Sequence, residues 1–287
     1  MRRKSPTQTM IETGARKLFK ADARKILYKD WLVHIFVHMI VLVCFTGIVS
    51  LGTQLTLLSY SFGLDEFRSS LFLAFYDVAA LFMTVPLCYG VLYFEMQYSD
   101  GKKPKPLDVF DGFSSVKKLL FSYELFFSLL FRVLPCFVPA VAMYVYMQYF
   151  YVEGTFVPLV DIAGVDEIFF LQSVAFVILV FLGFALSVKY FVGVYVAIKR
   201  QDMPIREAFY TGSVCCHNCN MSIAGFFLSF VPLFVVSLFT AGILFVLYTI
   251  PYFVISFMNM AKYLYDKEMT EENIKNIIYN FRTGDAG

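Results

Sequence analysis

The chain has few charged residues and no long polar segment. Only 16% of its 287 residues are Asp, Glu, Lys or Arg, whereas a soluble domain carries roughly a quarter. The longest segment that is not apolar is residues 1–30, which is shorter than an ordinary domain of about 50 residues or more. These 287 residues therefore leave no room for a soluble catalytic domain.

Several motifs that mark common enzymes are missing as well. The sequence contains no Gly-x-x-x-x-Gly-Lys-Ser/Thr phosphate loop, no His-Glu-x-x-His zinc motif and no Gly-x-Ser-x-Gly nucleophile elbow. Basic residues occur in several short segments and not in one compact patch, which argues against nucleic-acid binding. We expect a protein that is not an enzyme, that uses no cofactor and that does not bind nucleic acid.

Apolar residues, in contrast, make up 59% of the chain and include 34 Phe and 19 Tyr. They form long uninterrupted runs, and about 20 such residues in a helix cross a hydrocarbon core of about 30 Å. We predict an all-α fold, a polytopic membrane bundle of six transmembrane helices in three hairpins, each preceded by a cytoplasmic amphipathic helix. The first four spans cover residues 31–58, 71–94, 119–149 and 168–198.

The final apolar block, residues 221–265, is too long for one crossing. We expect it to break at Thr240-Ala241-Gly242, where small and flexible residues suit a tight turn between two helices. The chain then divides into a basic amphipathic segment (residues 1–30), a six-helix membrane domain (residues 31–265) and a cytoplasmic tail (residues 266–287).

Lys and Arg are distributed unevenly between the segments that connect the spans. Counting Lys262 at the end of the last apolar block, twenty-one of them lie in the N-terminal segment, in the segments after the second and fourth spans, and at the C-terminal end of the chain. The alternate segments contain only Arg68. Because basic residues are retained on the cytoplasmic side of a membrane, we predict that both termini face the cytoplasm.

The segment before the first span, from about Thr13 to Lys29, has the pattern of an amphipathic helix. Apolar residues at 18, 19, 23 and 26 alternate with the basic residues Arg16, Lys17, Lys20, Arg24 and Lys25. Such a helix is suited to the surface of an anionic inner leaflet. The expected partners are therefore the lipid bilayer and its anionic inner-leaflet lipids, and a protein partner would be of unknown identity.

The segments before the third and fifth spans share a short pattern, PLDVF at 106–110 and PIREAF at 204–209. Proline suits the first turn of a helix, and an acid close behind it suits the positive helix end. Upstream, Gly90-Val91 and Gly193-Val194 precede charged turns in both cases. We interpret the chain as three units, each a surface helix followed by a membrane hairpin.

Four stretches together resemble a known family: ARKLFK…ILYKDW before the first span, GVLYFEMQYSDGKKPKPLDVFDGF after the second, MPIREAFYTGS after the fourth, and SLFTAGILFVLYTIPYFVISFMNMAKYLYD near the end. Over about residues 12–268 the chain is similar to a six-span inner-membrane family of Gram-positive bacteria known as a domain of unknown function. That family is distantly similar to the membrane domain of some glycerophosphodiester phosphodiesterases. The stretch CCHNC departs from the Lys- and Gly-containing segment expected there. The resemblance implies a bacterial inner-membrane location and a six-span topology, but no reaction and no functional residues.

Arg132 lies inside the third apolar run, in SLLFRVLPC. At ~1.5 Å per residue it is ~20 Å above the cytoplasmic end of its span, and Asp77 is ~9 Å below the outer end of the second span. In a core of ~30 Å these depths coincide. An unpaired charge in hydrocarbon is costly, so we predict an ion pair of Asp77 and Arg132. The pair either fixes the register of two spans or marks a functional site, and both interpretations are open.

Other polar residues in the spans are secondary candidates. Glu124 and Lys189 form a second possible pair, although Lys189 also fits a side chain that extends to the inner interface. His34 and His38 share one face of the first span near its cytoplasmic end. They are candidates for a proton relay or half of a metal site, and packing against Tyr or lipid headgroups is the commoner interpretation. Glu95 lies near the same interface and is expected to have no special role.

Three cysteines, Cys215, Cys216 and Cys219, cluster in SVCCHNC. Cys216-x-x-Cys219 has the spacing of half a zinc site or of a redox dithiol. If the segment is helical, His217 points away from the face that Cys215 shares with Cys219. We therefore expect no metal, with these three thiols as weak candidates, and a helix end at the membrane surface as the simpler interpretation.

Two functions of different class fit the sequence. The first is a noncatalytic membrane protein, a scaffold or envelope-organising protein whose basic surface helices bind anionic lipid or a protein. The second is a small transporter or channel-like protein with an intramembrane Asp/Arg site. This alternative rests on spans broken at Pro86, Pro135, Pro139, Pro232 and Pro251, because interrupted helices build midplane binding sites in transporters. The small number of polar residues in the spans favours the first function.

Overall fold

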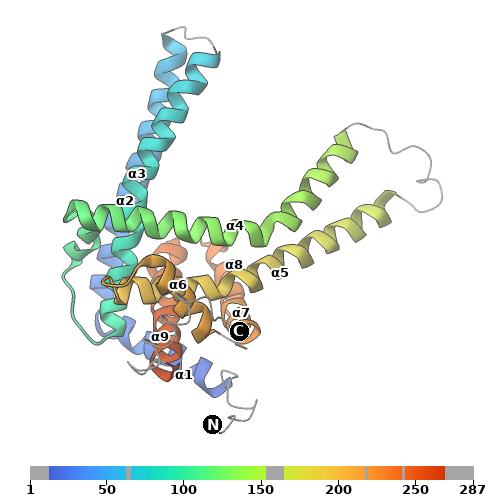
Figure 1. Ribbon diagram of the computed structural model, residues 1–287. Coiled ribbons are helices and arrows are strands. Elements are labelled where there is room, and N and C mark those ends of the chain that lie inside the picture. The colour runs from blue at the N-terminus through green and yellow to red at the C-terminus, as the bar shows by residue number, and fades with distance from the viewer. Residues whose placement is uncertain (1–12, 63–65, 153–164, 217–218, 241–242, 269–287) are drawn as a thin grey trace. The chain divides into compact units, whose positions relative to one another are not determined.

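A computed structural model describes residues 13–62, 66–152, 165–216, 219–240 and 243–268 (Figure 1). Within these ranges the regular elements are nine α-helices, the 3₁₀-helix η2 and the π-helix η4, and there is no strand. Six helical stretches are long and apolar enough to cross a membrane. The predicted all-α class and the predicted number of spans are confirmed, and six such stretches indicate a multi-pass membrane protein.

The chain forms two compact units that divide within the helix α4 (Val116–Val152). Among the described residues, unit 1 consists of Phe127–Leu228, and unit 2 consists of residues 13–126 together with Ser229–Lys267. Unit 2 therefore contains the first three helices and the last three helical elements, while unit 1 contains the middle of the chain.

Unit 2 begins with α1 (Thr13–Lys29), α2 (Trp31–Ser61) and α3 (Glu66–Ser99). The long helices α2 and α3 lie side by side (Figure 1). Most side chains on their outer faces are apolar and exposed, among them Val43, Val49, Phe75 and Met83. Apolar residues on all sides of a helix are expected where lipid surrounds it, so these faces fit contact with hydrocarbon.

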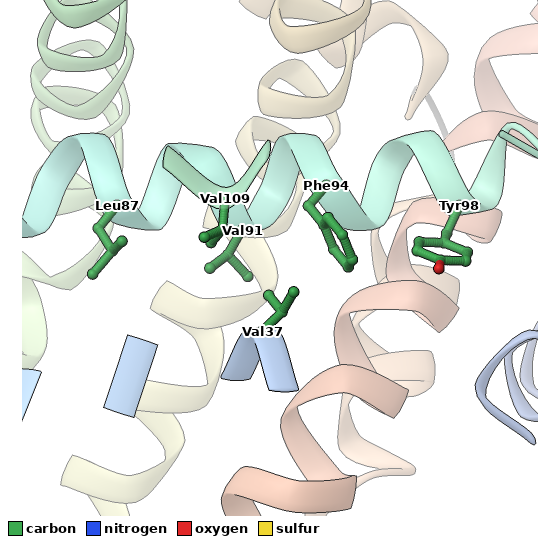
Figure 2. Close-up of a cluster of buried hydrophobic side chains, with 6 residues drawn as sticks. All are labelled: Val37, Leu87, Val91, Phe94, Tyr98 and Val109. Carbon is green, nitrogen blue, oxygen red and sulfur yellow. The ribbon is translucent and has the colours of Figure 1, made fainter. Parts of the chain in front are cut away.

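A cluster of buried side chains joins α2, α3 and the 3₁₀-helix η2 (Pro106–Phe113). Figure 2 shows Leu87, Val91, Phe94 and Tyr98 along one face of α3, because residues spaced by three or four positions share a helix face. Val37 of α2 faces this row, and the side chain of Val109 from η2 lies beside Val91 (Figure 2). The core of unit 2 is thus built on a stripe of α3.

The turn after α3 uses a glycine where the backbone requires one. Gly101 has a φ of +77°, a backbone conformation that residues other than glycine rarely adopt. The amide of Lys102 donates to the carbonyl of Gln97 (2.9 Å), and the amide of Gly101 donates to the carbonyl of Tyr98 (2.9 Å). These two bonds are the hydrogen bonds of a Schellman motif, and they direct the chain from α3 to η2.

Glycines allow the short helices to approach the long ones at two places. In unit 2, a Cβ added at Gly90 of α3 would overlap the carbonyl oxygen of Val109 in η2. In unit 1, a Cβ added at Gly193 of α5 (Val165–Lys199) would overlap the ring of Phe209 in α6 (Ile205–Cys215). Gly90 and Gly193 are the two glycines that the sequence pattern pairs, and each lies against the short helix that follows its own long helix.

Unit 1 is built around α5. Besides α6, this helix packs against α7 (Asn220–Leu228), where the ring of Phe227 contacts those of Phe184 and Phe191. A Cβ added at Gly183 of α5 would lie 2.6 Å from the carbonyl oxygen of Cys136 in α4. Close backbone approach at small residues is a common way for helices to associate in membranes.

The last apolar block contains two interruptions instead of one. The helix α8 (Val231–Phe239) ends with Thr240 as its C-cap, and helix resumes at residue 243, which confirms the predicted break. A second break separates α7 from α8 at Ser229 and Phe230, where Pro232, one of the prolines expected to interrupt a span, lies in the first turn of α8. Beyond the predicted turn, η4 (Phe245–Thr249) leads into α9 (Ile250–Glu268).

The prediction that prolines break the spans is wrong for three of the five. Pro86 lies inside the continuous helix α3, and Pro135 and Pro139 lie inside the continuous helix α4. In Figure 1, α4 bends along its course. Proline removes one backbone hydrogen bond and kinks a helix, so we attribute this bend to Pro135 and Pro139. Only Pro232 and Pro251 lie at the start of a helix.

The glycine contact between α3 and η2 can be tested with one methyl group. Gly90→Ala should destabilise the protein by about 1–3 kcal/mol, as overpacking does, because its Cβ would overlap the Val109 carbonyl oxygen. Gly47→Ala is the matched control, since a Cβ at Gly47 has nothing within 4 Å. The measurement is the temperature at which the detergent-solubilised chain loses its monodisperse size-exclusion peak. Equal temperatures for the two variants would show that the contact is not formed.

Candidate functional site

Three titratable side chains meet at one end of unit 2. His34 and His38 lie in the first two turns of α2, and Glu95 lies one turn before the end of α3. Nδ1 of His34 is 3.0 Å from Oε1 of Glu95, and both side chains are fully buried. Nδ1 of His38 is 3.9 Å from the same oxygen. The antiparallel course of α2 and α3 therefore brings two imidazoles to one carboxyl group.

Aromatic packing surrounds this cluster. The ring of His34 lies 4.4 Å from the ring of Tyr98 and 5.9 Å from the ring of Phe94, measured between centroids. Both aromatic residues belong to the buried stripe of α3 (Figure 2). The same stripe that packs α3 against α2 thus also covers the imidazole of His34.

The hydrogen bonds of the cluster leave three polar atoms unused. Nδ1 of His38 is 2.9 Å from the backbone carbonyl oxygen of His34, so this nitrogen donates, because a carbonyl oxygen only accepts. Within the described residues, Oε2 of Glu95 and Nε2 of each histidine are buried and have no hydrogen-bond partner. A buried polar atom without a partner costs free energy and calls for a physical reason.

Glu95, which was expected near the membrane interface, is fully buried beside His34. The expectation that it has no special role stays a prediction. The signal for this contact was available in the sequence, since Glu95 of the second span and His34 of the first are each only a few residues from the same end of their spans. The depth comparison that paired Asp77 with Arg132 would have found this pair too.

Arg132 has two contacts inside unit 1. Its Nη1 donates to the carbonyl oxygen of Ser128 (2.7 Å), and its Cζ lies 4.5 Å from the ring centroid of Phe209. A guanidinium over an aromatic face is stabilised by a cation–π interaction. Asp77 lies in unit 2 with an exposed side chain. Because the two residues belong to different units, their ion pair stays a prediction.

The second predicted pair also stays a prediction. Glu124 is an exposed residue of α4 in unit 2, whereas Lys189 belongs to α5 in unit 1. Lys189 is half-buried, and its Nζ lies 5.0 Å from the ring centroid of Tyr190. This contact places the charge on an aromatic face, as expected for a lysine near a membrane interface.

The three clustered cysteines are all buried. Among the described residues, no three His, Cys, Asp or Glu side chains are grouped so that they could hold a metal ion, and His217 lies outside those residues. Burial, and then the neighbouring thiols of Cys215 and Cys219, raises the pKa of Cys216 well above its usual value. A thiol with a raised pKa is a poor nucleophile and a poor redox group.

The N-terminal helix presents a basic surface. Lys17, Arg24, Lys25 and Lys29 are exposed on one side of α1, whereas Phe19, Ala23 and Leu27 are buried on the other. The bounds predicted for this helix, Thr13–Lys29, agree with the structure. Phe19, Ala23 and Leu27 of its apolar side are buried against protein, so lipid contact of α1 would involve the exposed side.

Comparison of the chain with protein-family models, with curated proteins and with solved structures gives no match.

The predicted pair of Asp77 and Arg132 can be tested with a double-mutant cycle. Asp77→Asn and Arg132→Gln should each lower the yield and melting temperature of the detergent-solubilised protein, because each leaves one charge without its partner. The double variant should recover part of the loss, with a coupling energy of about 1 kcal/mol or more.

Glu124→Gln combined with Arg132→Gln is the control pair for this cycle, and its effects should add. If Asp77→Asn and Arg132→Gln are additive as well, the two residues do not meet. The Phe209 ring and the Ser128 carbonyl would then be the contacts that accommodate the Arg132 charge.

Proposed function

We propose that this chain is a noncatalytic multi-pass membrane protein that binds anionic lipid headgroups through a fixed basic face and so acts as a membrane scaffold or envelope-organising protein. The observation that carries the proposal is the division of α1 into a buried apolar side and an exposed basic side. The exposed side holds Lys17, Arg24, Lys25 and Lys29. A cluster of four or more basic residues beside a membrane span is typical of anionic-lipid binding.

Protein contacts hold α1 in one orientation. Nδ2 of Asn259 in α9 donates to the carbonyl oxygen of Phe19 (3.4 Å), and the rings of Phe19 and Tyr263 lie 5.2 Å apart. Nζ of Lys20 donates to Oγ of Ser229 (2.6 Å). Burial, and then the nearby charge of Arg24, lowers the pKa of Lys20. The helix is therefore a fixed part of unit 2, and its basic face has a defined direction.

The ends of α3 and α9 lie beside each other at the same end of unit 2. Oγ of Ser99 donates to Oδ1 of Asn259 (2.7 Å), and Nζ of Lys262 is 3.1 Å from Oδ1 of Asp100. Because Asn259 also contacts α1, three segments that the charge distribution assigns to the cytoplasm come together here. These contacts support the prediction that the N-terminal helix, the turn after α3 and the end of α9 share one side of the membrane.

Additional basic and apolar side chains enlarge this surface. Lys102, Lys103 and Lys105 in the turn between α3 and η2 are exposed. Leu107 beside them is 70% exposed, and Leu32 at the start of α2 is 74% exposed. Basic side chains next to exposed apolar ones match a headgroup layer that borders hydrocarbon. Lipid phosphates are thus the ligands that match the basic and apolar side chains exposed at this end of unit 2.

The arrangement as three hairpins and the bacterial location belong to the same proposal. Contacts between consecutive helices support the hairpins: the ring of Tyr76 lies against Gly52, the rings of Tyr144 and Phe176 lie 6.2 Å apart, and the hydroxyls of Ser237 and Thr249 lie 2.7 Å apart. The resemblance to a six-span family of Gram-positive bacteria supports an inner-membrane location with both termini in the cytoplasm.

The transporter alternative loses part of its basis. It rested on helices interrupted near charged residues, but α3 continues through Pro86, and α4 continues through Pro135 and Pro139. A continuous helix with a proline loses single backbone hydrogen bonds, whereas the unwound helices of transporters expose a whole stretch of backbone groups to a solute. The lipid-binding scaffold is therefore the function that the described residues favour.

Lipid binding can be measured on the full chain in detergent. Replacement of Lys17, Arg24, Lys25 and Lys29 by Gln should lower the affinity for short-chain phosphatidylglycerol at least tenfold, because each basic residue near an anionic surface contributes about 1 kcal/mol. Affinity for phosphatidylcholine should not change. Added salt should weaken binding of the wild type and have little effect on the variant.

The matched control keeps the charge and changes the side chain, with the three lysines replaced by Arg and Arg24 by Lys. This variant should bind phosphatidylglycerol like the wild type. If the Gln variant also binds like the wild type, the basic face of α1 is not a lipid site, and the proposal fails.

A further inference from the structure

We propose that His34, His38 and Glu95 form a binding site for one proton at the end of unit 2 where α2 begins and α3 ends. The proposal is independent of lipid binding by α1. It follows from the hydrogen bonds of the cluster, from its charge and from its complete enclosure by protein.

The hydrogen bonds fix which atoms are free to accept a proton. Nδ1 of His38 donates to the carbonyl oxygen of His34. When Glu95 is ionised, Nδ1 of His34 donates to its Oε1 at 3.0 Å, since a carboxylate only accepts. Each neutral imidazole carries one hydrogen, and both hydrogens are now used. Nε2 of His34, Nε2 of His38 and Oε2 of Glu95 are then three acceptors without a donor.

The net charge of the cluster also favours the uptake of a proton. With Glu95 ionised and both histidines neutral, the cluster has a charge of −1 and lies out of contact with water, at 0–4% side-chain exposure. A buried charge without compensation is strongly disfavoured. One proton taken from the solvent, bound by an imidazole nitrogen or by the carboxylate, makes the cluster neutral. A second proton would make it positive, so the site accommodates one.

The neighbouring groups do not supply the missing positive charge. From α3, the phenol of Tyr98 faces His34, with 4.4 Å between the ring centroids. Between α1 and α2, the Asp30 carbonyl accepts from the His34 backbone amide at 3.3 Å, and the Asp30 carboxylate is a second negative group near Tyr98.

Charged groups on the other packed elements have partners of their own. On η2, Asp108 accepts from the Lys105 amide, and Asp111 pairs with Lys118 at 2.6 Å. On α9, Lys262 pairs with Asp100. On η4, Tyr248 lies in the field of Arg24 and Tyr28. Lys118 and Lys262 are paired with carboxylates, and Arg24 is exposed on the basic face of α1, so no described lysine or arginine of these elements forms an ion pair with Glu95. A cation is therefore the ligand that the cluster requires.

A proton is favoured over a metal ion for a geometric reason. Among the described residues, no three His, Cys, Asp or Glu side chains are placed to hold a metal, and the aromatic rings of Phe94 and Tyr98 pack directly on His34. A proton needs no ligand shell and no additional volume. Because His34 belongs to α2 and Glu95 belongs to α3, a proton bound between them also strengthens the contact between these two helices.

The test is a pH titration of the full chain in detergent, labelled with ¹⁵N at histidine. The chain has three histidines, so His217→Gln leaves only His34 and His38 and assigns their signals. The ring-nitrogen signals of His34 should change with pH in a single transition. Glu95→Gln, which removes the negative charge and keeps the shape, should move or abolish that transition. Tyr98→Phe should leave it in place.

Three results would overturn the proposal. His34 signals that do not change with pH would show that no proton is exchanged, and this needs only the wild type. A transition that is the same in Glu95→Gln would show that the carboxylate takes no part. Signals that change when EDTA is added would show that a metal ion occupies the cluster. If Glu95→Gln does not fold, His38→Gln takes its place and should likewise alter the His34 transition.

Discussion

The interior of a bilayer contains no water that could hydrogen-bond to the peptide backbone, so each segment that crosses it must satisfy its own amides and carbonyls. The rest of this structure depends on that constraint. It explains why every regular element among the described residues is helical and why α3 and α4 continue through their prolines. It also explains why the helices approach one another at Gly90, Gly183 and Gly193, where close contact replaces the hydrophobic effect that lipid cannot supply.

The same constraint determines where polar side chains can gather. In unit 2 polar contacts pair Glu95 of α3 with His34 of α2, Ser99 of α3 with Asn259 of α9, and Lys20 of α1 with Ser229 in the turn before α8. Each of these contacts joins segments that are far apart in the sequence, so they help to fix the packing that the apolar stripe of α3 begins. The basic face of α1 is exposed, whereas the cluster of His34, His38 and Glu95, which we propose as a proton site, is enclosed by protein.

Much of the fold could be predicted from the sequence, because length and hydropathy alone determine how many helices can cross a bilayer. The break at Thr240 and the bounds of α1 followed from turn chemistry and from helical periodicity. The orientation of each helix about its own axis could not be predicted from the sequence. The apolar stripe of α1, which includes Phe19 and Ala23, has the same spacing whether it faces lipid or α9, and hydropathy cannot distinguish the two.

The candidate site was predicted only in part for the same reason. His34 and His38 were found because a spacing of four places them on one face, but Glu95 was set aside as an interfacial residue and its depth was not compared with that of His34. Three of the prolines were misjudged because a proline inside a helix can bend it without ending it. The pairing of Arg132 with Asp77 stays a prediction, and the contacts of Arg132 with the Ser128 carbonyl and the Phe209 ring could not be read from the sequence, because they depend on how the helices pack.

The central claim is that the basic segments which meet at the polar end of unit 2 all lie on the cytoplasmic side of the membrane. Site-specific reporters inserted at residues 63–65, 102–103, 153–164 and 201–202 of the otherwise intact chain, and at each terminus, test this most directly. The account predicts an external signal at 63–65 and 153–164, and a cytoplasmic signal at 102–103, 201–202 and both termini. A cytoplasmic signal at 63–65 or 153–164, or an external one at 102–103, would contradict it.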